Sequence, residues 1–324
     1  MNKKDIIPTT IKVVKGGPKL ITKAAVAKPI TKSSTQSKQI PSKPISSKVD
    51  KPTKVNKLPK TIRKGLLVGL NYTGTSNQLA GCINDTENLK KFLVDKNFFK
   101  ESELTFMNDK LTGDLYPNKA NIMKQLNNLV SFANNNKTSN VSLFFAYSGH
   151  GAYIADKNGD EADKRDEVIC PLDFQSAGFI IDDDIRKLFI DKLPSNVKIV
   201  MLFDSCFSGT VCDLKYSYKV DPNNTISAAM KLSQTVCNIV MISGCKDTQT
   251  SADAYEIDPT TNAYEYQGAM SASFIANYTT NVTYNQLITK MRLWLKQHSY
   301  LQIPQLSSGK LVNIDTSFLL NTFI

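Results

Sequence analysis

The sequence predicts an α/β fold in which a mostly parallel β-sheet carries helices on both faces. Three uninterrupted apolar runs predict buried strands, at residues 141–147 (VSLFFAY), 198–203 (KIVMLF) and 238–243 (NIVMIS). Strands that are apolar on both sides are typical of parallel sheets, because both faces of such a sheet are covered. Segments with apolar side chains at helical spacing alternate with these strands, and this alternation is the pattern of an α/β domain.

The remaining elements follow from local patterns. Further apolar runs predict strands at residues 65–70 and 104–107. Apolar side chains three and four positions apart predict helices at about residues 118–133, 185–190, 271–277 and 284–297. We also predict a helix with Leu89, Phe92 and Leu93 on its apolar face, capped at its start by Asn84 or Asp85.

The positive charge of the chain is concentrated in its first 60 residues. The 324 residues have a net charge of +11, yet residues 1–60 hold 15 lysines and two acids, against 25 bases and 27 acids in residues 61–324. Residues 1–60 also hold seven of the 13 prolines and no aromatic side chain. Because such a segment cannot bury enough apolar surface to offset its ordering entropy, we expect a disordered leader. Residues 61–324 are expected to form the folded domain.

Composition excludes several classes of protein. No apolar run approaches the ~18 residues of a membrane-spanning helix, and the amino-terminal residues lack the apolar stretch of a secretory signal. Six cysteines without a CxxC pair favour a reducing compartment, and we expect a cytoplasmic protein. Two histidines exclude a multi-histidine metal site. Lysines without arginine or interleaved aromatic residues bind nucleic acid only weakly, so no specific nucleic acid partner is expected.

Two predicted strands end in residues that are suited to nucleophilic catalysis. Residues 141–147 lead into SGHG and residues 198–203 into DSCFSG, which puts His150 and Cys206 just beyond the strand ends, where the chemistry of open α/β sheets lies. A Cys206 thiolate would attack a carbonyl carbon while His150 protonates the leaving amine. The N–H groups of Gly151 and Cys206 are candidates for the oxyanion hole. The alternatives are a hydrogen-bonded core histidine and a cysteine that acts as a small buried hydrophobe.

These motifs and others in the same order resemble the metacaspases, which are caspase-like cysteine peptidases. The resemblance covers about residues 62–320 and rests on YSGHG, DSCFSG, GLLVGLNY, LAGCINDTENL, DEVICPLDF, SGCKDTQTSADA and QIPQLSSG. It implies a caspase-like three-layer sandwich with His150 and Cys206 as the dyad. Within residues 61–324 it implies a large region at about 61–215, a linker at 216–235 and a small region at 236–324.

The resemblance also implies cleavage after Arg or Lys. A pocket for a basic side chain needs carboxylates, and Asp204 lies two residues before Cys206. Asp182 is the second candidate, and Ser148 would add a hydroxyl group. Cys82 matches a family cysteine that lines this pocket.

Calcium activation is a further implication of the resemblance. Ca²⁺ prefers oxygen ligands, and the residues that fall where the family's ligands fall are Asp166, Asp182, Asp183 and Asp213. The alternative for the run of acids at residues 182–184 is a helix N-terminus, which Asp184 is expected to cap.

An enzyme that cuts after Lys is expected to process itself as a zymogen. The candidate sites lie in or near the leader and the linker, at Lys57, Lys60, Lys64, Lys215, Lys219 and Lys231. Protein substrates with exposed Arg or Lys are the expected partners, and the resemblance favours a monomer. One alternative is a catalytically silent caspase-like scaffold that acts through its basic leader. A Cys/His peptidase with another preference and a nucleic-acid-binding protein are further alternatives.

Overall fold

The computed structural model describes residues 60–155, 165–205, 208–209, 211–218, 226–228, 232–244, 253–257 and 264–320. The chain divides into two units, Met1–Val55 and Asn56–Ile324. The first unit, which contains most of the predicted leader, lies outside the described residues. All elements given below belong to the second unit.

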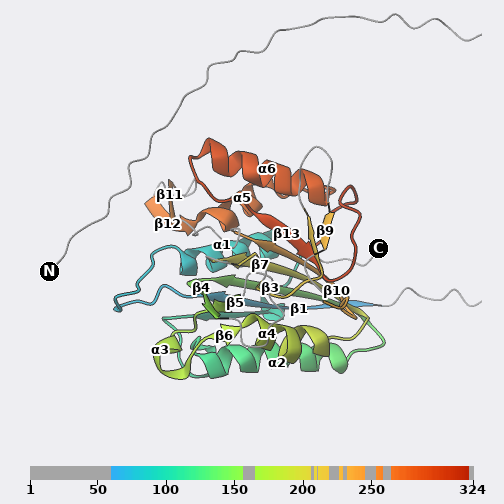
Figure 1. Ribbon diagram of the computed structural model, residues 1–324, viewed down its shortest axis with the longest axis horizontal. Coiled ribbons are helices and arrows are strands. Elements are labelled where there is room, and N and C mark those ends of the chain that lie inside the picture. The colour runs from blue at the N-terminus through green and yellow to red at the C-terminus, as the bar shows by residue number, and fades with distance from the viewer. Residues whose placement is uncertain are drawn as a thin grey trace, which may run out of the picture. The chain divides into compact units, whose positions relative to one another are not determined.

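The second unit is built on an eight-stranded sheet (Figure 1). Its strands, in spatial order, are β2 (Leu104–Asn108), β1 (Thr61–Gly69), β3 (Asn140–Ser148), β7 (Val197–Asp204), β10 (Asn238–Ser243), β13 (Gln305–Ser308), β8 (Tyr216–Tyr218) and β9 (Ile226–Ala228). The first five strands are parallel to one another, and the last three pair in antiparallel fashion. The described residues also form two small antiparallel sheets, from β4 (Gly151–Ala155), β5 (Arg165–Ile169) and β6 (Ile180–Ile181), and from β11 (Asp253–Ile257) and β12 (Tyr264–Gly268).

Helices cover both faces of the large sheet. In Figure 1, one layer below the sheet contains α2 (Lys119–Asn134), α3 (Phe174–Ala177) and α4 (Asp182–Asp184), and the layer above it contains α1 (Cys82–Asp95), α5 (Ala269–Asn277) and α6 (Tyr284–Gln297). Short helical turns complete the described elements: η1 (Glu101–Glu103), η2 (Gly113–Leu115), η3 (Ile185–Phe189) and η4 (Ile190–Lys192). None of the helices in the described ranges has the length and apolar character needed to cross a membrane.

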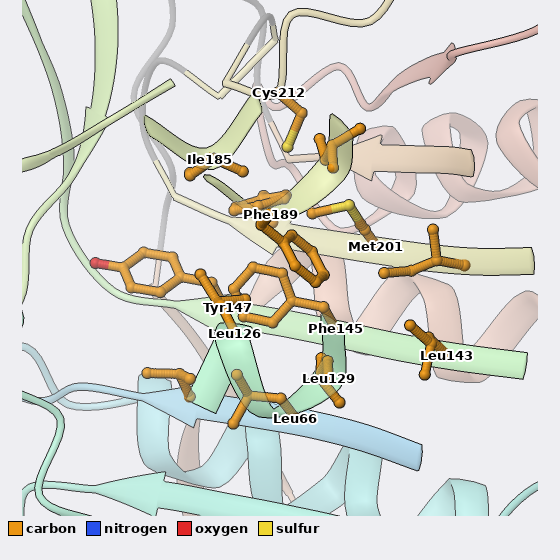
Figure 2. Close-up of a cluster of buried hydrophobic side chains, with 14 of the residues drawn as sticks. Leu66, Leu126, Leu129, Leu143, Phe145, Tyr147, Ile185, Phe189, Met201 and Cys212 are labelled. Carbon is orange, nitrogen blue, oxygen red and sulfur yellow. The ribbon is translucent and has the colours of Figure 1, made fainter. Parts of the chain in front are cut away.

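The alternation of side chains along the central strands produces two cores. Phe145 on β3 points into one core, where it packs with Leu126 and Leu129 of α2 (Figure 2). Its neighbour Phe144 points to the other face and packs in a second core with residues of α1 and α5, among them Phe274. Successive side chains of a strand point to opposite faces, so a strand between two helical layers must be apolar throughout. This requirement explains the uninterrupted apolar runs in the sequence.

The predicted central elements are confirmed. The five apolar runs form β1, β2, β3, β7 and β10, and the helices predicted at 118–133, 271–277 and 284–297 are α2, α5 and α6. The segment 185–190 is helical, but it forms the π-helical turn η3 and the 3₁₀ turn η4. The linker predicted at 216–235 contains β8 and β9, both of which belong to the large sheet.

Two predicted helix caps are wrong. Helix α1 begins at Cys82 with Gly81 at the N-cap, so Asp85 lies inside the first turn and its side chain is directed to other partners. Asp184 occupies the N-cap position of η3 but makes no capping hydrogen bond with its side chain, whereas Asp182 accepts a hydrogen bond from the main-chain N–H of Asp183 (2.7 Å).

Candidate active site

The two strand ends that carry the catalytic motifs lie next to each other. Strands β3 and β7 are adjacent and parallel, with Ser148 paired to Asp204 at their carboxyl ends. The N–H of Gly149 also donates to the carbonyl oxygen of Asp204 (3.4 Å). Cys206 lies outside the described residues, two positions beyond Asp204 in the chain. The register therefore brings the SGHG loop to the strand that leads to the predicted nucleophile.

The side chain of His150 is oriented by a main-chain carbonyl group. Its Nε2 atom lies 2.7 Å from the carbonyl oxygen of Asn77. Because a carbonyl oxygen only accepts hydrogen bonds, the bond places the proton on Nε2 and leaves the lone pair of a neutral imidazole on Nδ1. In this tautomer, His150 has a basic nitrogen for a thiol proton. Asn77 was not predicted from the sequence, since a main-chain carbonyl has no residue-type signal.

The groups proposed for the oxyanion hole are only partly described. Gly151 is the first residue of β4 and pairs with Ile169 of β5. Next to this pair, the N–H of Cys170 donates a hydrogen bond to the carbonyl oxygen of His150 (3.1 Å). Cys206, the second candidate, lies outside the described residues.

Two buried carboxylates converge beside the end of β3. Asp85 accepts hydrogen bonds from the Ser148 hydroxyl group and from the N–H of Gly268. Asp204 accepts one from the N–H of Ser271 (2.9 Å). A Cβ atom at residue 268 would contact the Oδ2 atoms of both acids, so both carboxylates lie against Gly268. Asp85 and Asp204, called the carboxylate pair below, therefore bring two acidic side chains together, and amide and hydroxyl donors bond to them.

Of the residues predicted for substrate binding, the structure brings Ser148 and Asp204 together in this place. Cys82 is buried at the first position of α1, one helical turn before Asp85. Asp85 itself was missed because it was interpreted as a cap. The sequence did contain a signal for Asp85. Residues three apart on a helix lie on the same face, so if Cys82 lines the substrate pocket, Asp85 is expected to face that pocket too.

A second set of acids lies near the start of α4. Glu167, Asp182 and Asp213, called the acidic group below, are buried, and the charges of Glu167 and Asp213 act on Asp182. Asp166 is also buried and precedes Glu167 on β5. Asp182 accepts the N–H groups of Glu167 and Asp183, each at 2.7 Å. Burial first, and then the charge of Asp213, raises the pKa of Asp182 to about 9. Asp182 was predicted both for the substrate pocket and for the calcium site. Its contacts lie within the acidic group, so we do not assign it to the carboxylate pair.

Two basic side chains accompany the acidic group. The buried guanidinium group of Arg186 donates to the carbonyl oxygens of Asp213 (2.6 Å) and Ser233 (3.1 Å) and pairs with Asp191 (2.8 Å). Asp183, the other predicted metal ligand, pairs with the exposed Lys187 (3.0 Å). Within the described ranges, no three His, Cys, Asp or Glu side chains are grouped closely enough to hold a metal ion as they stand. The donor chemistry suits Ca²⁺, while binding would require the carboxylates to reorient.

The predicted self-cleavage sites differ in accessibility. Lys60 is exposed and precedes β1. Lys64 lies within β1, where it pairs with Leu143 of β3, so cleavage after it would require the sheet to open. Lys215 is half-buried beside β8. Lys57, Lys219 and Lys231 lie outside the described residues.

Comparisons with known proteins agree with these motifs. Residues 63–215 match the family described as "Metacaspase, peptidase C14 domain". Metacaspase-1 of Kluyveromyces lactis is 36% identical over 307 residues, which cover 80% of this chain and 68% of that protein. Metacaspase-1 of Cryptococcus neoformans is 36% identical over 305 residues, which cover 79% of this chain and 64% of that protein. The chain thus spans about two thirds of the length of these relatives.

Solved structures provide a comparison of fold. A protein from Geobacter sulfurreducens aligns over 80% of this chain and 97% of its own, with a TM-score of 0.53 and 22% identity. Caspase-1 from Spodoptera frugiperda aligns over 80% of this chain and 91% of its own, with a TM-score of 0.45 and 13% identity.

Proposed function

Because the chain belongs to the metacaspase family of cysteine peptidases, we propose that it is a calcium-activated endopeptidase that cleaves after Arg or Lys. The observation that carries the specificity is the carboxylate pair. Two buried acids on adjoining elements, held against one glycine, form an environment that attracts a cation and repels an Asp side chain. The orientation of His150 by the Asn77 carbonyl group supports the catalytic part of the proposal.

The reaction proceeds through an acyl-enzyme. His150 Nδ1 takes the proton of the Cys206 thiol, and the sulfur attacks the carbonyl carbon of the substrate. The C–N bond breaks as His150 returns this proton to the leaving amine. Water then attacks the thioester while His150 accepts a proton from it. The new carboxylic acid leaves, and His150 restores the thiol.

The carboxylate pair is proposed to receive the Arg or Lys side chain of the residue before the cleaved bond. Asp85 and Asp204 supply the charge, and the hydroxyl group of Ser148 orients Asp85 through its hydrogen bond. Cys82 is the candidate wall residue beside Asp85. A guanidinium or ammonium group that pairs with two carboxylates is bound far more tightly than a neutral side chain.

The acidic group is the proposed calcium site. Burial, and then the charge of Asp213, disfavours the ionised form of Asp182 and raises its pKa to about 9. A divalent cation would remove this penalty, because it supplies the opposite charge to Asp166, Asp182, Asp183 and Asp213. The bond from Arg186 to the carbonyl group of Asp213 connects this site to the segment that follows Cys206 in the chain.

Self-processing is proposed near the start of β1 or in the segment between β7 and β10. Lys60 is favoured among the described sites, since it is exposed and precedes the sheet. Mass spectrometry after calcium addition should detect fragments that end at Lys60 or at another of the predicted lysines. A Cys206→Ala protein should stay intact, and its trimming would assign the cleavage to a contaminating protease.

Paired peptides test the specificity directly. Peptides that differ only in Arg, Lys or Asp before the cleaved bond are incubated with the full chain, with and without calcium. We expect cleavage of the Arg and Lys peptides only, with calcium, and none by Cys206→Ala. Calcium-independent activity, or an unchanged calcium response in Asp183→Ala, would contradict the calcium proposal. An inactive wild-type protein under all conditions would favour the silent scaffold.

A further inference from the structure

Two buried tyrosines hold both main-chain groups of His150. The N–H of His150 donates to the hydroxyl oxygen of Tyr72 (3.0 Å). The hydroxyl group of Tyr147 donates to the carbonyl oxygen of His150 (2.8 Å). Both phenol rings are buried, with about 1% of their surface exposed. The histidine backbone is therefore fixed by side chains on both of its polar groups.

The same two hydroxyl groups also bond to the main chain of Cys170 on the neighbouring segment. Tyr72 donates to the carbonyl oxygen of Cys170 (2.6 Å), and the N–H of Cys170 donates to the hydroxyl oxygen of Tyr147 (3.2 Å). Each hydroxyl has one proton to donate and lone pairs to accept. Tyr72 donates to Cys170 and accepts from His150. The Tyr147 hydroxyl group has two carbonyl acceptors, His150 at 2.8 Å and Cys170 at 3.1 Å, and accepts from the N–H of Cys170. The two hydroxyl oxygens lie 3.2 Å apart. These bonds form one connected set in which each hydroxyl is both donor and acceptor.

The packing around the two hydroxyl groups leaves room only for glycine at position 149, directly before His150. A Cβ atom at Gly149 would lie 2.8 Å from the Tyr147 hydroxyl oxygen and 3.0 Å from that of Tyr72. The glycine of the SGHG motif is thus required for the close approach of the two tyrosines. Tyr72 itself has a φ of +52°, a left-handed conformation that is costly for a non-glycine residue and that often marks a functional position.

The loop that follows β1 fixes the imidazole as well as the backbone. Tyr72 lies 4.7 Å from the His150 ring, measured between ring centroids, and Asn77 of the same loop accepts the hydrogen bond from Nε2. The loop is closed by bonds of its own main chain, including Leu79 N–H to the carbonyl oxygen of Asn71 (2.8 Å). One loop therefore contacts both the main-chain N–H and the imidazole ring of His150.

From this geometry we infer that Tyr72 and Tyr147 are positioning residues: their paired hydroxyl groups hold the main chain of His150 so that its Nε2 atom stays bonded to the Asn77 carbonyl group, which sets the tautomer. The inference rests on the proposed function of His150 as the base. Burial keeps the pKa of both phenols well above the ordinary value, so they stay neutral and act through hydrogen bonds. Neither hydroxyl group takes part in proton transfer to the substrate.

The test compares Tyr72→Phe and Tyr147→Phe with Tyr218→Phe in the full chain. Tyr218 is a matched control, because it is equally buried and its hydroxyl group also has two partners, Ser308 Oγ and Val312 N–H, both at 2.7 Å. We expect kcat on an Arg peptide to fall by about 10- to 10²-fold in the two test variants, with KM changed by less than about threefold. Tyr218→Phe should keep kcat within about twofold of wild type.

A second readout is independent of peptidase activity. The chain has only two histidines, so ¹⁵N labelling of histidine gives signals from His150 and from His298, whose Nδ1 atom lies 2.7 Å from the carbonyl oxygen of Trp294. We expect the His150 nitrogen shifts in Tyr72→Phe and Tyr147→Phe to move toward the average of the two tautomers. The His298 signals should not move in these variants. In Tyr218→Phe, neither the His150 nor the His298 signals should move.

The outcomes separate the two proposals. Unchanged His150 shifts together with a kcat no lower than that of Tyr218→Phe would overturn the positioning role. A wild-type protein that cleaves no peptide would contradict the proposed function, while the nitrogen shifts would still decide whether the tyrosines orient His150. If one Tyr→Phe variant does not fold, the other decides the inference, because each hydroxyl holds a different main-chain group of His150.

Discussion

The protein contains two sets of buried acids, and each combines main-chain N–H donors with a second acid nearby. The carboxylate pair receives hydrogen bonds from Ser148, Gly268 and Ser271. The acidic group brings like charges together, and its member Asp182 has a pKa raised to about 9 by burial and by Asp213. Hydrogen-bond donors favour the charged form of a carboxylate, while burial and like charges disfavour it. The proposed function supplies the opposite charge in each case, an Arg or Lys side chain for the first set and Ca²⁺ for the second.

The largest expected effect comes from neutralising the carboxylate pair. Asp204→Asn or Asp85→Asn should lower kcat/KM for Arg peptides by about 10²-fold or more, because a buried charged partner is lost. Peptide assays measure this effect, and Asp114→Asn is the control that removes the same formal charge from an exposed site. Equal activity of the variants and the control would remove the carboxylate pair from substrate recognition.

Neutralising the acidic group should affect calcium and leave specificity intact. In Asp213→Asn we expect the calcium concentration for half-maximal activity to rise by about 10- to 10²-fold, since a ligand oxygen loses its charge. The ratio of Arg to Lys cleavage at saturating calcium should not change. A calcium titration with both peptides measures the two quantities, and a shift in the ratio alone would show that the two sets of acids are not separate.

Gly268→Ala tests how closely the carboxylate pair is packed. The added Cβ atom would press on the Oδ2 atoms of Asp85 and Asp204, so we expect about a tenfold loss of kcat/KM for Arg peptides. Calcium activation should be unaffected. Gly74→Ala provides the comparison, because a Cβ at that position meets no atom within 4 Å, although its positive φ of 78° adds backbone strain. Full activity of Gly268→Ala would indicate that the pair tolerates displacement.

The smallest expected effect is a pH dependence of stability in the calcium-free protein. The folded protein retains a proton on Asp182 up to about pH 9, whereas an unfolded carboxyl group loses it near pH 3.9. The folded state binds more protons in this window, so stability falls as pH rises through it. We expect the Tm of the Cys206→Ala protein to fall by a few degrees between about pH 6 and pH 8.

Two controls make the pH experiment specific. Asp182→Asn should flatten the decline, because an amide does not titrate. Saturating calcium should also flatten it, because the cation favours the ionised form of the acid. A decline of the same size in all three samples would assign the pH dependence to groups other than Asp182.

The five parallel strands of the large sheet were predictable, and its antiparallel strands and the small sheets were not. Strands such as β3 and β7 are covered on both sides, so their apolar runs identify them without further information. β4 to β6 and β13 are short, and β13 has the polar sequence QLSS. Their existence depends on pairing with distant segments, which local patterns do not record. The two strands in the predicted linker were missed for the same reason.

The candidate site divides in a similar way. His150, Cys206 and Asp204 were predicted because they follow apolar strands and belong to specific motifs. Asp85 was interpreted as a helix cap. The sequence around it is the same whether its side chain bonds to the N–H groups of its own helix or to that of Gly268. The role of Asn77 depends on its carbonyl group, which every residue possesses.

The sequence by itself determined the order of the central elements and the residue types at the two strand ends, because apolar runs and reactive side chains are local properties. Only the tertiary structure decided which groups meet. The register of β3 against β7 brings Ser148 beside Asp204, and the packing of α1 and β12 directs Asp85 to Gly268. The loop after β1 delivers Tyr72 and Asn77 to His150. These contacts join residues that are distant in the chain, and their free energy depends on burial and distance.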